Sequence, residues 1–153
     1  MGTTLWNPIA SEADVKHLLT IFGSFHDSCL REVHVWTEHW VSPDLQMHCS
    51  GDLDTRVRLL VQRQFPNPSA IELLFERVVS FHLQPAPQNY DSIIFEATML
   101  LDGDVVLWAD SSDWTYTSEN RDSFTWVAAQ KVSWRDASEW MGSDLRYGSL
   151  DSH

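Results

Sequence analysis

Residues 23–36, GSFHDSCLREVHVW, mark the point at which a helical pattern gives way to a strand pattern. Gly23 predicts the end of a helix, because glycine enters the left-handed conformation without a clash at Cβ. The run from Cys29 to Trp36 is rich in β-branched and aromatic residues, which favours a strand. A polar corner, His26-Asp27-Ser28, lies between the two patterns.

The segment before this junction has the pattern of one amphipathic helix over residues 12–22. Apolar residues recur there at i, i+3, i+4 and i+7, which places them on a single stripe. Ser11 and Asp14 form a Ser-x-x-Asp capping box at the start of this helix. The stripe needs an apolar surface to cover, and it consists of Val15, Leu18, Leu19 and Phe22.

The segment after the junction changes to a period of two and has no second helical pattern. Short turns between successive strands favour an antiparallel meander, so we expect an α+β fold with one N-terminal helix on a mainly antiparallel sheet of about six or seven strands. The chain is predicted to be one domain over 1–153, with 136–153 as a frayed tail from which Trp140 and Tyr147 can dock back. Strands are expected at 29–40, 45–49, 55–65, 70–83, 92–101, 105–109 and 123–135.

The strands at 55–65 and 70–83 are expected to pair, which would set Arg56 and Arg58 beside Glu72 and Glu76 as a cross-strand charge ladder. The same alternation places Val79 on the apolar face.

Arg63 and Arg77 also fall on the apolar face of this pattern. They can lie near strand ends, or past a bulge, with their heads in water. Alternatively, they can form a concave anion-binding face.

Composition limits the classes of partner. The 153 residues include 22 acidic and 10 basic ones, and the net charge of −12 disfavours binding to nucleic acid. A cationic protein or a bound cation would complement this charge, although an acidic balance also serves solubility alone. The N-terminus lacks a signal-peptide pattern and no apolar run could span a membrane, so a cytoplasmic protein is expected, with Cys29 and Cys49 as small core residues.

His26-Asp27-Ser28 has the residue types of a hydrolytic triad, but adjacent residues on an extended chain cannot converge. One interpretation is structural: Asp27 or Ser28 caps the turn and His26 packs beside Phe25. The other is a metal site assembled from separate strands, although no zinc-type spacing is present and no cofactor is predicted. That site would draw on His26, Asp27, His34, His48 and Cys49.

The aromatic residues raise a further possibility, because they are more numerous than one modest core readily absorbs. Aromatic side chains are enriched at interface anchors, so a patch rimmed by acids would suit a basic protein partner or a homodimer. They can equally be spread along both sides of the sheet. The group consists of Trp36, Trp40, Trp108, Trp114, Tyr116 and Trp140, and the candidate binding residues are His26, Asp27, Trp36, Trp40, Trp114 and Tyr116.

Three runs carry a resemblance to a known group of proteins: FGSFHDSCL at 22–30, RLLVQRQFPNP at 58–68 and AAQKVSWR at 128–135. Together they resemble a group of small uncharacterised bacterial proteins. The Phe-His-Asp-Ser start of the first strand is also similar to proposed immunity proteins of polymorphic toxin systems. The resemblance implies an acidic α+β protein that binds and blocks a toxin, and no catalytic residue comes with it.

We therefore expect a non-enzymatic protein-binding module whose partner is a cationic toxin. The alternative is a small-ligand or metal-binding protein, or a hydrolase, that uses the His26/Asp27 corner.

Overall fold

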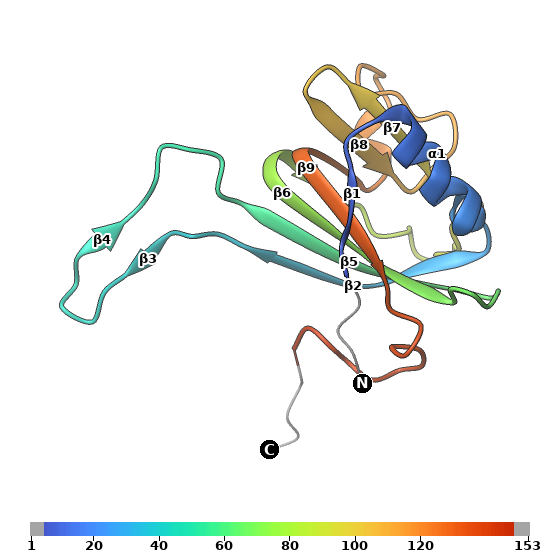
Figure 1. Ribbon diagram of the computed structural model, residues 1–153, viewed down its shortest axis with the longest axis horizontal. Coiled ribbons are helices and arrows are strands. Elements are labelled where there is room, and N and C mark those ends of the chain that lie inside the picture. The colour runs from blue at the N-terminus through green and yellow to red at the C-terminus, as the bar shows by residue number, and fades with distance from the viewer. Residues whose placement is uncertain (1–4, 149–153) are drawn as a thin grey trace.

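A computed structural model describes residues 5–148 of the chain. It contains one α-helix and a seven-stranded antiparallel sheet, so the predicted α+β class is confirmed (Figure 1). The elements of the body are β1 (Asn7–Ile9), α1 (Glu12–Ile21), the 3-10 turn η1 (Gly23–Phe25), β2 (Ser28–Trp36), β5 (Arg56–Arg63), β6 (Ala70–His82), β7 (Thr98–Asp102), β8 (Val105–Ala109), the 3-10 turn η2 (Arg121–Ser123) and β9 (Trp126–Asp136).

The sheet has the order β2-β5-β6-β9-β8-β7 and every pairing in it is antiparallel. The hairpins β5-β6 and β7-β8 follow the chain as a meander does, whereas β9 inserts between β6 and β8. Beyond the end of β8, the second half of β9 pairs with the short strand β1, which the sequence did not predict. The first strand pair, β2-β5, is joined by a second small hairpin of β3 (Trp40–Val41) and β4 (Met47–His48).

The main core lies between one face of this sheet and α1. Leu18 and Phe22 from the helix side are fully buried with Leu59, Leu73 and Trp108 from the sheet. Burial of each such side chain stabilises the fold by about 1.5–3 kcal/mol. The amphipathic stripe of the helix therefore covers the sheet as expected.

The helix begins and ends where the sequence predicts. The Ser11 hydroxyl accepts a hydrogen bond from the Asp14 amide at 3.2 Å, and Phe22 is the last cap residue. Gly23 has φ of 57°, and the following Ser24 and Phe25 share this left-handed region. Three left-handed residues in succession turn the chain sharply from α1 into β2.

Arg63 ends β5 directly beneath this turn. Its guanidinium donates to the carbonyl oxygens of Pro68 at 2.8 Å and Ile21 at 3.2 Å, and it lies 4.6 Å from the ring centre of Phe22. The expected position at a strand end is confirmed. The side-chain head, however, binds backbone carbonyls instead of extending into water. Ile21 ends α1, where carbonyls lack helical partners, and Pro68 lies in the loop between β5 and β6.

Strand β6 changes its register at Arg77, which has φ of 53°. The pairing with β9 shifts between Val78 and Ser80, so Val78 is buried and Val79 is 45% exposed. The prediction that Val79 shares the apolar face was wrong, and the expected bulge near Arg77 explains why. Arg77 itself points outward and donates to Asp52 and Gln130.

Other predicted boundaries need correction. The strand expected over 29–40 ends at Trp36, and the strand expected over 92–101 begins only at Thr98, because 92–97 pairs at a single bridge between Ser28 and Ile94. Cys29 and Cys49 are exposed, not core residues. Within residues 5–148, no helix is long and apolar enough to cross a membrane.

Candidate protein-binding surface

A hairpin arm, residues 37–55, projects from the body as a continuation of β2 and β5 (Figure 1). Its two strands β3 and β4 pair in the register Trp40 with His48 and Val41 with Met47. These two strands form a separate sheet, and within residues 5–148 no further strand pairs with it. The arm is the most extended feature of the molecule.

The arm has a defined internal structure. The indole of Trp40 stacks on the imidazole of His48 with ring centres 3.9 Å apart and planes 4° from parallel. At its tip, the Ser42 amide donates to the Gln46 carbonyl at 2.9 Å, and the Leu45 amide donates to the Ser42 carbonyl at 2.8 Å. These bonds close a turn around Ser42-Pro43-Asp44, whose residue types favour turns.

Ion pairs at the base of the arm connect it to the body. Glu38 pairs with Arg56, which is the first residue of β5, and Asp52 accepts from Arg77 at 3.0 Å. The hydrogen bond from Arg77 lowers the pKa of Asp52, so this carboxylate remains charged at neutral pH. Within the arm, His39 lies 3.1 Å from Asp54.

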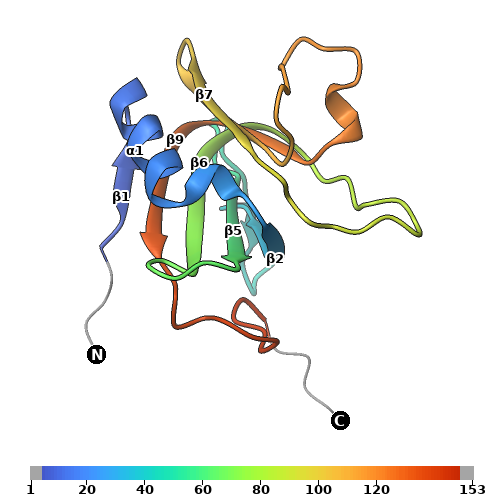
Figure 2. The same cartoon turned by 90° about the vertical axis from the view of Figure 1, so that its right-hand side faces the viewer.

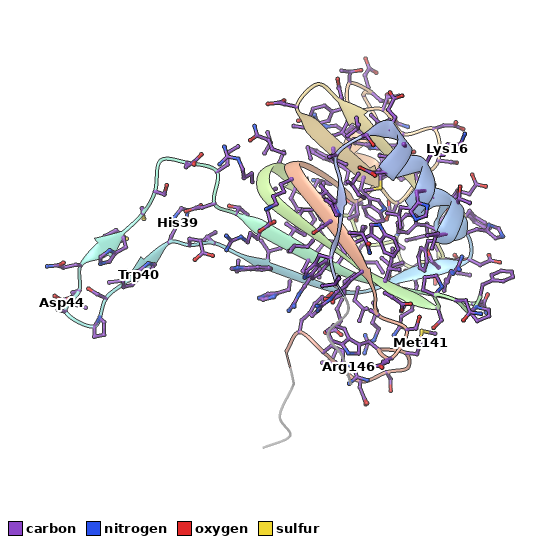
Figure 3. All side chains as sticks on the ribbon, viewed as in Figure 1. Lys16, His39, Trp40, Asp44, Met141 and Arg146 are labelled. Carbon is purple, nitrogen blue, oxygen red and sulfur yellow. The ribbon has the colours of Figure 1, made fainter. Side chains whose placement is uncertain are left out.

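Large apolar side chains of the arm face solvent. Trp40 is 55% exposed, Leu45 84% and Met47 69%, and Val41 and Leu53 are also exposed. In Figure 3 the indole of Trp40 stands on the arm, well away from the core of the body. Large apolar side chains gathered on one projecting hairpin indicate a surface that binds something.

The arm also carries an acidic balance. Between Trp36 and Arg56 the sequence contains no lysine or arginine. Glu38, Asp52 and Asp54 are engaged at the base, so the outer half contributes the carboxylate of Asp44 beside the apolar residues. One face of the hairpin thus carries Trp40 with His48 and the other carries Val41 with Met47, and the carboxylates lie at the tip and the base.

The His26/Asp27 corner is an exposed turn. His26 Nδ1 lies 2.8 Å from the Phe95 carbonyl oxygen and Nε2 lies 3.2 Å from Asp27 Oδ2, so both ring nitrogens have partners within or beside the corner. Ser28 is buried and its hydroxyl donates to the Phe25 carbonyl at 2.6 Å. The capping expected of Ser28 is therefore present, whereas His26 faces solvent and Phe25 enters the core.

The structure does not bring the predicted metal ligands together. His26 and Asp27 precede β2, His34 lies on β2, and His48 lies on the arm. Over residues 5–148, no group of three or more His, Cys, Asp or Glu side chains is placed to hold a metal ion. His34 instead stacks on Trp36 and accepts at Nδ1 from Arg58 at 3.3 Å.

The other predicted aromatic residues lie in different surroundings. Trp36 is half-buried at the end of β2, next to the base of the arm. Trp114 is only 4% exposed, and its indole N–H donates to the Arg121 carbonyl at 3.1 Å. Tyr116 contacts Trp126 edge to face with ring centres 5.4 Å apart. Trp114 and Tyr116 thus belong to a second small core, and Trp40 is the exposed aromatic residue of the predicted set.

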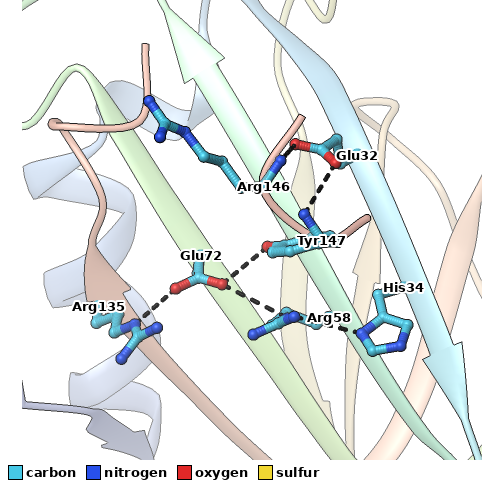
Figure 4. Close-up of polar contacts among 7 residues, drawn as sticks. All are labelled: Glu32, His34, Arg58, Glu72, Arg135, Arg146 and Tyr147. Atoms are coloured by element: carbon cyan, nitrogen blue, oxygen red, sulfur yellow. Dashed lines mark hydrogen bonds and ion pairs between the residues drawn. The ribbon is translucent and has the colours of Figure 1, made fainter. Parts of the chain in front are cut away.

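A network around Glu72 occupies the sheet face opposite α1 (Figure 4). Glu72 is fully buried and accepts from Arg135 Nε at 2.6 Å and from the Tyr147 hydroxyl at 2.9 Å. Arg58 Nε lies 3.7 Å from the same carboxylate, which confirms the predicted ladder partner. Arg58 also stacks on the Tyr147 ring at 4.0 Å.

The C-terminal segment covers this network. The backbone amides of Arg146 and Tyr147 donate to Glu32 at 2.8 and 3.2 Å, and Trp140 packs edge to face on Tyr147. Burial, and next the charge of Glu72, raises the pKa of the Tyr147 hydroxyl, so it remains a donor. The predicted docking of Trp140 and Tyr147 is confirmed. The donors and acceptors of this network bind one another, so we assign to it a role in the stability of the fold.

The arm was missed at the sequence level because its residues read as ordinary strand and turn. One signal was available in the sequence. Val41, Leu45 and Met47 are apolar residues among polar neighbours, and their spacing does not form the stripe of an amphipathic helix. Of the partners of Glu72, the sequence predicted Arg58 but not Arg135 and Tyr147, because these two residues are distant from Glu72 in sequence.

The chain was compared with family models, curated proteins and solved structures, and none of them matches.

Proposed function

We propose that this chain is a non-enzymatic protein-binding module that captures a cationic protein through the arm, and that neutralisation of a toxin is the concrete form of this role. The observation that carries the proposal is the projecting hairpin with exposed Trp40, Leu45 and Met47. Exposed aromatic and aliphatic anchors of this kind contribute most of the binding energy at protein interfaces. The choice of a toxin as the partner rests on the resemblance to small bacterial proteins and to proposed immunity proteins, which is carried by residues 22–30, 58–68 and 128–135.

Charge supports a cationic partner. A molecule with net charge −12 attracts basic proteins over several ångströms and accelerates their encounter at low ionic strength. The same charge opposes association between two copies of the chain. A basic partner is therefore favoured over a homodimer as the occupant of the arm.

The test is a capture experiment with matched variants of the full chain. The wild type, an arm variant (Trp40→Ser with Leu45→Ser and Met47→Ser) and a control variant (Met141→Ser) are each expressed in the native host and purified at low salt. Met141 is a suitable control because it is 41% exposed and lies on the side of the body away from the arm (Figure 3). Bound proteins are identified by mass spectrometry.

We expect the wild type and the control to retain a basic protein that salt releases, and the arm variant to lose it. A basic protein held equally by all three chains would contradict the role of the arm. Absence of any stoichiometric basic protein would contradict the binding role. The toxin form requires one more result: the captured protein must stop growth when expressed alone, and co-expression of the wild type but not the arm variant must restore growth.

A further inference from the structure

Strand β2 is an edge of the sheet. It pairs with β5 on one side, and on its other side the described residues provide a single bridge, in which Ser28 and Ile94 exchange backbone hydrogen bonds of 3.3 and 2.7 Å. Beyond this bridge the strand continues to Trp36, and no second strand within residues 5–148 pairs with it. An edge of this kind is a template for another extended segment.

The direction of the free backbone groups follows from the pairing. Ser28 directs its N–H and C=O away from β5, and backbone groups alternate along a strand. A bulge between Leu30 and Glu32 shifts the alternation by one. Val33 and Val35 therefore direct their N–H and C=O groups to the open side, whereas His34 faces β5 opposite Arg58.

A cleft of about 540 Å³ lies beside this edge. Its floor is formed by residues 30–33 of β2, and its walls are formed by the loops 83–96 and 110–125. Figure 2 shows both loops extending from the body on the side of β2 and β7. Apolar side chains at its rim are exposed to solvent, namely Leu83, Tyr90, Ile93 and Phe95.

The charged residues that line the cleft are predominantly acidic. They are Glu32, Asp91, Glu96 and Asp110, and Arg31 is the single basic residue among the described lining residues. The Arg31 guanidinium already donates to the Ser143 carbonyl at 2.6 Å. Asp110 is half-buried and accepts from the Thr125 amide at 3.1 Å, and its burial raises the pKa of its carboxyl to about 6. At neutral pH these carboxylates favour lysine or arginine.

We infer that an extended segment of the cationic partner adds to the free edge of β2, with its backbone paired to Val33 and Val35, an apolar side chain in the cleft and a lysine or arginine against Asp110. This inference rests on the proposed function and names how the partner binds. The arm continues β2, so the free edge leads toward the arm and one partner can contact both surfaces. Strand addition supplies affinity from main-chain hydrogen bonds, and alternate side chains supply specificity.

The first test uses the full chain and a short capped peptide in which lysine and valine alternate. Amide hydrogen exchange is followed by NMR with and without a saturating amount of peptide. We expect exchange at Val33 and Val35 to slow by about tenfold or more, because new backbone bonds protect these amides. The same peptide N-methylated at every residue has no N–H to donate along either edge, so it is expected to give no protection. Absence of binding, or binding without protection at these two amides, overturns the inference.

Two variants extend the test to the captured protein. Val35→Pro removes an outward N–H without removing a bond to β5, and Val35→Thr keeps that N–H as the control. We expect Val35→Pro to weaken capture about tenfold relative to Val35→Thr. Asp110→Asn keeps the acceptor for Thr125 and is expected to weaken capture about two- to fivefold.

The outcomes separate the two proposals. Equal capture by Val35→Pro and Val35→Thr overturns strand addition, and the role of the arm stands if the arm variant still fails. Peptide protection at Val33 and Val35 without capture of any basic protein overturns the proposed function. If Val35→Pro does not fold, the exchange measurement on the unmodified chain decides the inference by itself.

Discussion

The carboxylate of Glu72 has no access to water, so hydrogen-bond donors around it must compensate for the cost of burying its charge. Removing it leaves Arg135 and Tyr147 without their acceptor and leaves the charge of Arg58 without its nearest carboxylate. We expect Glu72→Ala to lower the free energy of unfolding by about 3–5 kcal/mol, as for other broken buried pairs. Urea denaturation at neutral pH measures this loss.

Glu76 provides the matched control for Glu72, because it lies on the same strand and the same face. It pairs with Arg56 at 3.6 Å and Lys131 at 3.5 Å, but its side chain is 24% exposed. Glu76→Ala is expected to cost at most about 1 kcal/mol, because water screens such pairs. Similar losses for the two variants would contradict the structural role assigned to the Glu72 network.

Asp110 makes the stability of the chain depend on pH. Burial raises its folded-state pKa from 3.8 to about 6, so the folded state binds more protons than the unfolded state between these values. Its contribution to stability is therefore present at low pH and is lost as pH rises toward and through about 6. Above that pH the ionised carboxylate destabilises the fold.

Asp110→Asn should reveal this effect. We expect the variant to be more stable than the wild type at pH 8 by about 1–2 kcal/mol, after allowance for partial exposure. The difference should shrink as pH falls below the folded pKa and disappear well below pH 3.8, where both states of the wild type are protonated. Urea titrations of the two proteins across this range test it, and a difference that does not vary with pH would contradict the assignment.

At the scale of elements, the junction between α1 and β2 depends on Gly23. Alanine there must adopt φ of 57°, and its Cβ would lie 3.0 Å from Arg63 Nη1. The left-handed strain alone costs about 1–2 kcal/mol. We therefore expect Gly23→Ala to lower the free energy of unfolding by more than that amount, as measured by urea denaturation.

Gly103 isolates the strain from the contact. It has φ of 62° in the β7-β8 turn, and a Cβ there would meet nothing within 4 Å. Gly103→Ala should therefore show the strain alone, and the excess loss at Gly23 should vanish in an Arg63→Ala background. Equal losses at the two glycines would show that Arg63 does not constrain the junction.

Elements with a strong local pattern could be predicted from the sequence. The cap at Ser11, the stop at Gly23, the hairpin around Gly103 and the charge ladder from Arg58 to Glu72 all follow from local chemistry. The order of the strands could not, because the insertion of β9 between β6 and β8 depends on contacts between distant segments.

For some segments, the sequence also did not predict which side chains are buried and which are exposed. The left-handed Arg77 and the register shift after Val78 reset the alternation in β6. Arg77 on the apolar face indicated a bulge as one alternative, but periodicity did not show that Val79 would leave that face. Ile93 and Phe95 alternate as a strand would, yet they are exposed on the loop that lines the cleft. The candidate binding surfaces could thus not be predicted, because their residues have the alternating pattern of a core strand.

At the scale of the whole molecule, the arm should matter for binding and not for folding. The side chains of Trp40, Leu45 and Met47 are largely exposed, so serine at these positions removes little buried area. We expect the arm variant to keep its free energy of unfolding within about 0.5 kcal/mol of the wild type, as measured by urea denaturation. A large loss would show that the arm stabilises the body.

The net charge should govern the rate of association with the captured protein. We expect the association rate constant to fall as salt is raised, while the dissociation rate constant changes much less, because distant charges act on the encounter. Stopped-flow mixing at several salt concentrations measures both constants. An association rate that does not respond to salt would contradict electrostatic attraction.

The exposed arm gives the net charge of −12 a second consequence, which concerns the protein as a colloid. Each molecule displays an apolar hairpin to every other molecule, and mutual repulsion keeps these hairpins apart. Acidification that neutralises the carboxylates removes this repulsion while the apolar surface remains. The protein is therefore expected to cluster and scatter light near its isoelectric point, and serine in place of Trp40, Leu45 and Met47 is expected to keep it dispersed.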